Sequence, residues 1–148
     1  MEEFNTIEKV KKLFSDKGLQ NDGIYLALLK DTRKTAGMVG GMEYPYDGLL
    51  LNISDDGIGY YYLKNAKFSL MIKLEKLVVD KEFYTFLSND DIKSVELKKF
   101  ALLDSKRKEL IIKTNDKKTH YVYGSIKDDL LPYHNENMAK LIEKYSSK

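Results

Sequence analysis

The clearest hydrophobic pattern lies at the end of the chain. Between residues 135 and 146 the apolar side chains recur at i, i+3, i+4 and i+7: Met138, Leu141, Ile142 and Tyr145. This spacing places them on one face of a helix, while Lys140 falls on the opposite, solvent-facing side. Asn135 is suited to cap the helix start, and Glu136 to the positive end of its dipole. We expect this amphipathic helix to close the core.

Alternating or β-branched runs predict the strands that precede this helix. The runs cover residues 24–29, 49–53, 58–63, 83–87, 92–98, 109–114 and 119–123. The Asp56-Gly57 step between two apolar runs predicts a tight hairpin, and polar residues 115–118 predict a second one. Residues 68–79 fit both a strand and a helical stripe. We prefer a strand there, because another β-rich run follows closely.

The first third of the chain adds one helix and one irregular stretch. A helical stripe begins near the N-terminus: Phe4, Ile7, Val10 and Phe14. Asn5 and Glu8 have the spacing of a capping box at its start. Residues 30–47 show no period and contain three glycines and a proline, so we expect a loop whose most mobile part is 38–42.

Composition narrows the class of protein. The 148 residues predict a single domain, 1–148, with an N-terminal helix within 1–18 and a β-rich part over 24–147. The 25 basic and 23 acidic residues nearly balance, which argues against a nucleic-acid partner. The chain has no cysteine, no apolar stretch long enough to cross a membrane, and no apolar core of a signal peptide near its start. We expect a soluble, cytoplasmic protein.

The order of about seven strands and one closing helix resembles the pleckstrin-homology-like (PH-like) domains, particularly bacterial members. The resemblance covers residues 24–145 and rests on three sequence segments: DGLLLNISDDGIGYYYL, FLSNDDIKSVELKK and ELIIKTNDKKTHYVY. It implies a mainly β, α+β barrel of two packed antiparallel sheets, capped by the C-terminal helix. The predicted N-terminal helix lies outside the resemblance and is an addition to this barrel. Eukaryotic members usually carry a tryptophan in the final helix, so Leu141 or Tyr145 would fill that place here. A different small β-barrel is the alternative.

Candidate catalytic and metal-binding residues are few. His120 lies within a predicted strand and His134 just before the last helix, which is too little for a zinc site. The acidic pairs Asp90–Asp91 and Asp128–Asp129 stand in turn-like contexts, where aspartate is favoured for local hydrogen bonding. We therefore expect no metal, no cofactor and no enzymatic activity.

Two basic clusters remain as candidate binding sites: Lys30, Arg33 and Lys34, and Lys106, Arg107 and Lys108. In PH-like proteins that bind phosphoinositides, basic residues on the first two strands and their loop hold the head group, and the first cluster occupies the matching loop. Our leading hypothesis is a non-catalytic module that binds a protein or peptide. The alternative is a peripheral binder of anionic lipid head groups through Lys30, Arg33 and Lys34. An enzyme of unrecognised type comes third, and the oligomeric state is left open.

Overall fold

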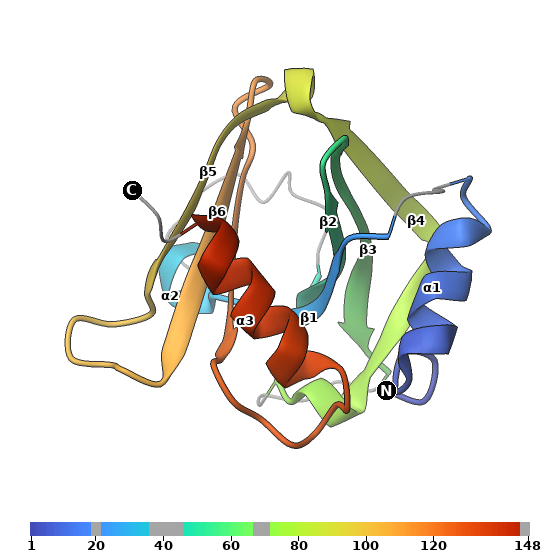
Figure 1. Ribbon diagram of the computed structural model, residues 1–148, viewed down its shortest axis with the longest axis horizontal. Helices are drawn as coiled ribbons and strands as arrows, with labels where there is room; N and C mark the ends of the chain where they lie inside the picture. The colour runs from blue at the N-terminus through green and yellow to red at the C-terminus, as the bar shows by residue number, and fades with distance from the viewer. Residues whose placement is uncertain (19–21, 36–45, 67–71, 146–148) are drawn as a thin grey trace.

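The structure, a computed structural model, describes residues 1–18, 22–35, 46–66 and 72–145 (Figure 1). Its elements follow in chain order: α1 (Ile7–Ser15), β1 (Ile24–Lys30), α2 (Thr32–Thr35), β2 (Gly48–Ser54), β3 (Gly57–Asn65), the 3-10 helix η1 (Leu74–Lys76), β4 (Leu77–Ser88), the 3-10 helix η2 (Asn89–Asp91), β5 (Ile92–Lys99), β6 (Arg107–Thr114), β7 (Thr119–Ser125) and α3 (His134–Tyr145). The loop predicted to be mobile, 38–42, lies outside the described residues, as do residues 68–71 of the ambiguous segment.

All seven strands belong to one antiparallel sheet with the order β4-β3-β2-β1-β7-β6-β5. Its two blocks, β4-β3-β2-β1 and β7-β6-β5, join through the pairs Leu29–Tyr123 and Lys30–Val122. Figure 1 shows the blocks splayed apart. The prediction of two packed sheets that close into a barrel is wrong. The sheet is single, and its edge strands β4 and β5 do not pair to close it. The short η2 turns the chain at the corner, so that β5 leaves at an angle to β4.

The inner face of the sheet carries the first core. Its fully buried members come from β1, β2, β3, β6, β7 and α3, and include Leu26, Leu51, Leu110, Val122, Met138 and Leu141. Ile142 and Tyr145 pack at its margin. Figure 1 shows α3 crossing the opening between the two blocks. The prediction that the Met138–Leu141 face enters the core of the sheet is confirmed.

The outer face of β1, β2 and β3 carries a second core, beneath α1 and the residues that precede it. Phe4, Val10 and Phe14 are fully buried here against Tyr25 and Tyr61. Strands that are buried on both faces read as nearly continuous apolar runs, because neither face needs polar side chains. This explains why residues 24–29 and 49–53 showed so little alternation.

The Asp56-Gly57 hairpin is confirmed, with Ser54 paired to Gly57 and β2 antiparallel to β3. Both helix starts differ from the prediction, that of α1 by one residue and that of α3 by two. Thr6, not Asn5, caps α1 by accepting a hydrogen bond from the backbone N–H of Lys9. Asn135 lies inside α3, where its side chain accepts from the backbone N–H of Asp128.

Two further segments differ from the predicted pattern. The first described residues after β1 form the short helix α2, inside the stretch predicted as a loop. Leu74–Lys76 forms a 3-10 turn, and β4 begins at Leu77, so the end of the ambiguous segment is neither a strand nor an α-helix. Among the described helices none has the length and hydropathy needed to cross a bilayer.

Candidate functional site

The predicted cationic residues Lys30, Arg33 and Lys34 engage partners within the fold. The Arg33 guanidinium donates to both carboxylate oxygens of Asp31, from Nε at 3.0 Å and from Nη2 at 2.9 Å. Lys34 Nζ lies 3.5 Å from Glu109 Oε1. Lys30 Nζ stands 4.6 Å from the centre of the Tyr46 ring. Arg33 and Lys34 thus converge on two acidic side chains, whereas Lys30 faces an aromatic one.

Those two acidic side chains, Asp31 and Glu109, are 1% and 0% exposed. Ionisation of one of these carboxyl groups opposes ionisation of the other, because both are buried and they interact with each other. Burial and the interaction with Asp31 raise the pKa of Glu109 to about 7. Burial opposes ionisation of Asp31 as well, but hydrogen bonds from Arg33 outweigh it and lower the pKa of Asp31 to about 2. Glu109 is therefore the proton carrier of the pair.

Phe100 brings the two basic clusters together. Its ring lies between the guanidinium carbons of Arg33, 3.7 Å from the ring centre, and Arg107, 4.4 Å from it. The ring also packs on Tyr123, with centroids 4.1 Å apart. A shallow hollow of about 440 Å³ lies beside it, lined by lysines and apolar side chains above buried Glu109: Lys34, Lys98, Lys99, Phe100, Ala101 and Leu102.

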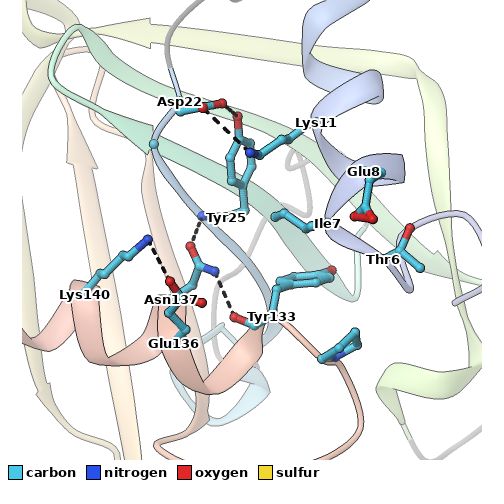
Figure 2. Close-up of a pocket in the computed structure, with 12 residues that line it drawn as sticks. Thr6, Ile7, Glu8, Lys11, Asp22, Tyr25, Tyr133, Glu136, Asn137 and Lys140 are labelled. Atoms are coloured by element: carbon cyan, nitrogen blue, oxygen red, sulfur yellow. Dashed lines mark hydrogen bonds and ion pairs between the residues drawn. The ribbon is translucent and has the colours of Figure 1, made fainter.

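A larger cleft of about 540 Å³ lies between α1, the start of β1 and the start of α3. Figure 2 shows its two sides, with α1 contributing Ile7 and Lys11 and α3 contributing Asn137 and Lys140. Tyr25 and Tyr133 lie between them and are almost wholly buried. The cleft therefore has an aromatic floor and charged rims.

Hydrogen bonds fix the floor to three separate segments. The backbone N–H of Tyr25 donates to Asn137 Oδ1 at 2.9 Å, and Asn137 Nδ2 donates to the Tyr133 carbonyl at 2.8 Å (Figure 2). The Tyr133 hydroxyl donates to the Phe4 carbonyl at 2.5 Å. These bonds join β1, α3 and the N-terminal segment, so the cleft is held open by the fold itself.

The rims of the cleft are charged, but their charges are internally paired. Lys11 Nζ lies 3.7 Å from Asp22 Oδ2 on one side, and Lys140 Nζ lies 3.4 Å from Glu136 Oε1 on the other. Burial and then the neighbouring Asp22 raise the pKa of Tyr25 to about 12. Burial also raises the pKa of Tyr133. Both phenols therefore keep their protons at neutral pH, and neither is prepared to act as a base or a nucleophile.

The two histidines have structural partners, as the sequence suggested. His120 is buried in the inner core, where the Tyr46 hydroxyl lies 2.9 Å from Nδ1 and the Tyr60 hydroxyl 3.3 Å from Nε2. Burial lowers the pKa of His120 to about 4, so the ring is neutral at pH 7. His134 Nε2 hydrogen-bonds the Ser125 carbonyl at 2.6 Å.

The predicted acidic pairs also have local roles. Asp91 accepts hydrogen bonds from the backbone N–H and the hydroxyl of Ser88, and Asp128 accepts from the backbone N–H of Leu130. Within the described ranges, no three histidine, aspartate or glutamate side chains gather around a point where they could hold a metal ion.

Sequence reasoning missed the cleft and the Asp31–Glu109 pair. Tyr25 and Tyr133 read as ordinary core residues, and their proximity depends on contacts between segments over a hundred residues apart. Glu109 offered one usable signal, since it directly precedes the buried apolar run of β6 and follows three cationic residues. No protein-family model, no curated protein and no solved structure matches this chain.

Proposed function

We propose that this protein is a non-catalytic binding module and that its partner is a peptide or protein segment held in the cleft between α1, β1 and α3. The observation that carries the proposal is the aromatic floor formed by Tyr25 and Tyr133. Tyrosine combines a rigid aromatic ring with a polar end, and it is enriched at the centres of protein interfaces.

The dimensions and rims of the cleft support this proposal. Its volume of about 540 Å³ is suited to one or two side chains of a partner. Lys11 and Lys140 on opposite rims can pair with acidic groups that flank an apolar anchor, at a small loss because their present partners are exposed. The raised pKa values of both tyrosines favour binding over reaction.

The order of elements supports the PH-like assignment as part of this proposal. Four antiparallel strands, three further antiparallel strands and one closing helix follow in the sequence that the resemblance implies. A bacterial PH-like module with an added α1 accounts for both the inner and the outer core. The open sheet is the feature that departs from this assignment.

Two other binding modes have weaker support. Strand addition at the β5 edge is discouraged by its solvent-facing side chains, Lys93, Glu96, Lys98 and Lys99, since charged residues on an edge oppose pairing with another strand. Head-group binding through Lys30, Arg33 and Lys34 is weakened because Arg33 is already paired with the buried Asp31 and Lys34 already lies 3.5 Å from the buried Glu109.

Selection of peptides from a displayed random library against the full chain tests the proposal. We expect the selected peptides to carry an aromatic or aliphatic anchor next to acidic residues. In amide NMR spectra they should shift the signals of residues 6–11, 22–25 and 133–140. Shifts centred on β4 or β5, or a failure to select any peptide, would contradict the cleft as the binding site.

Charge reversal provides the matched control. Lys11→Glu combined with Lys140→Glu should weaken the selected peptides by about ten-fold or more, since each reversal turns an attraction of roughly 0.5–1 kcal/mol into a repulsion. Lys93→Glu combined with Lys113→Glu changes the net charge equally on β5 and β6, away from the cleft. This second pair should leave the affinity unchanged.

A further inference from the structure

Two leucines project from the connection between β5 and β6. Leu102 and Leu103 are 86% and 94% exposed, the highest values for large hydrophobic residues in the described part of the chain. The backbone N–H of Asp104 donates to the Ala101 carbonyl at 3.0 Å, which closes a turn with the two leucines at its centre. Figure 1 shows this hairpin extending well beyond the rest of the fold.

Internal contacts hold the turn in this conformation. The Asp104 carboxylate accepts hydrogen bonds from the backbone N–H groups of Lys106 and Arg107 at 2.9 and 3.0 Å. Arg107 Nε donates to the same carboxylate at 2.6 Å, and its guanidinium stacks on Phe100. The acidic charge is thus turned inward and neutralised, while the leucines point outward from a rigid base.

Cationic residues flank this turn, at the end of β5 and around the start of β6. Four of them form no ion pair with any residue that the structure describes: Lys98, Lys99, Lys106 and Lys108. The nearby acids are engaged elsewhere, because Asp104 binds Arg107 and the buried Glu109 faces Lys34. The end of this hairpin therefore combines two exposed leucines with four lysines whose charge no described acidic residue balances. We call these four lysines the lysine collar.

We propose that the tip formed by residues 98–108 docks on an anionic lipid surface. Leu102 and Leu103 would enter the interfacial region, and the lysine collar would contact the anionic head groups. An apolar insertion and a basic patch together are the two signals that a peripheral protein needs for membrane attachment. The proposal goes beyond the peptide-binding function, because the tip and the cleft share no residue.

The shape and charge of the tip favour a lipid surface over a protein. The turn projects from the fold with both leucines exposed, and a bilayer accepts such a projection without a matching pocket. A second copy of this chain would bring one lysine collar against another, so like charges would oppose that contact. The collar matches the negative potential of anionic lipids instead.

Co-sedimentation of the full chain with phosphatidylcholine vesicles, with and without phosphatidylserine, tests this proposal. Wild type should bind the vesicles that contain phosphatidylserine, and added salt should weaken this binding. Leu102→Ser with Leu103→Ser should lower it about ten-fold for each leucine. Lys98→Gln with Lys99→Gln should lower it about five-fold for each lysine.

Lys93→Gln with Lys113→Gln removes the same charge from the opposite end of β5 and β6, and it should have little effect. All six substituted side chains are at least partly exposed, so thermal unfolding should confirm that every variant folds. The cleft variant with Lys11→Glu and Lys140→Glu should keep full vesicle binding. A failure of the peptide-binding proposal is thereby separated from a failure of this one.

The absence of tryptophan in this chain allows a direct measurement of insertion. The emission of Leu103→Trp should shift to shorter wavelength with anionic vesicles alone, whereas Phe86→Trp on β4 should not respond. The proposal is overturned if wild type ignores phosphatidylserine vesicles, or if the serine variant binds as well as wild type. The proposal is also overturned if wild type binds no vesicles and instead self-associates with rising concentration or captures an acidic protein, and if the serine variant loses that association.

Discussion

Removal of the Leu141 side chain should cost a large part of the stability of the fold. Leu141 is completely buried in the inner core, where α3 meets the strands of both blocks. Leu→Ala at such a position costs about 2–5 kcal/mol, because the lost burial is joined by a cavity that the neighbours only partly fill. Against a total of about 5–15 kcal/mol this is severe. Urea unfolding should show it as a midpoint lower by about 1–2.5 M, for a slope of about 2 kcal/mol/M.

Lys140→Ala on the opposite face of α3 is the matched control. The Lys140 side chain is half exposed, and its pair with Glu136 at 3.4 Å spans one helical turn. Such an exposed pair contributes about 0.3–0.5 kcal/mol, so the midpoint should move by no more than about 0.3 M. Equal midpoints for the two variants would mean that α3 is an appendage, and that the inner core is closed in some other way.

Three further outcomes follow from buried or strained groups. The folded state favours neutral His120, so the contribution of His120 to stability is complete above pH 6.5, and about 3 kcal/mol of it is lost as the pH falls through 4. Urea midpoints should therefore drop over this range, and the drop should be smaller in His120→Gln. For Glu109 the pH dependence has the opposite sign, because its pKa is raised: its contribution is complete below pH 4.5 and is lost as the pH rises through 7. The stability of Glu109→Gln relative to wild type should therefore increase over that window, and a constant difference would refute the raised pKa. Gly57→Ala should cost about 2 kcal/mol or more in thermal unfolding, because φ is +151° and a Cβ would lie 2.1 Å from the Leu87 carbonyl oxygen; an unchanged midpoint would refute this.

Periodicity predicted the elements whose partners lie nearby in the sequence or on one face. The face of α3 that bears Met138 and Leu141 was readable because the other face is charged. The Gly57 hairpin was readable because its turn and both strands occupy one short stretch. The alternation of Val95 and Leu97 in β5 likewise indicates one partly buried and one solvent-exposed face.

Features that depend on distant contacts could not be read from the sequence. Continuous apolar runs in β1 and β2 indicated burial, but not that Phe4 and Phe14 cover their outer face. The corner at η2 decides whether the sheet closes, and its polar residues resemble any turn. Glu109 was unremarked because its significance depends on Asp31, which lies 78 positions earlier in the sequence.

The cleft and the tip differ in how their charges are arranged, and this difference assigns them different tasks. Lys11 and Lys140 are already paired at the rims of the cleft, so affinity there must come mainly from contact with the tyrosine floor. Lys98 and Lys106 at the tip have no such partner among the described residues, and their field extends about 8 Å into solution at physiological salt. Unpaired charges speed the approach to an oppositely charged surface, whereas a fixed aromatic floor discriminates between shapes. The tip is therefore suited to locate the protein on a surface, and the cleft to select the partner that it binds there.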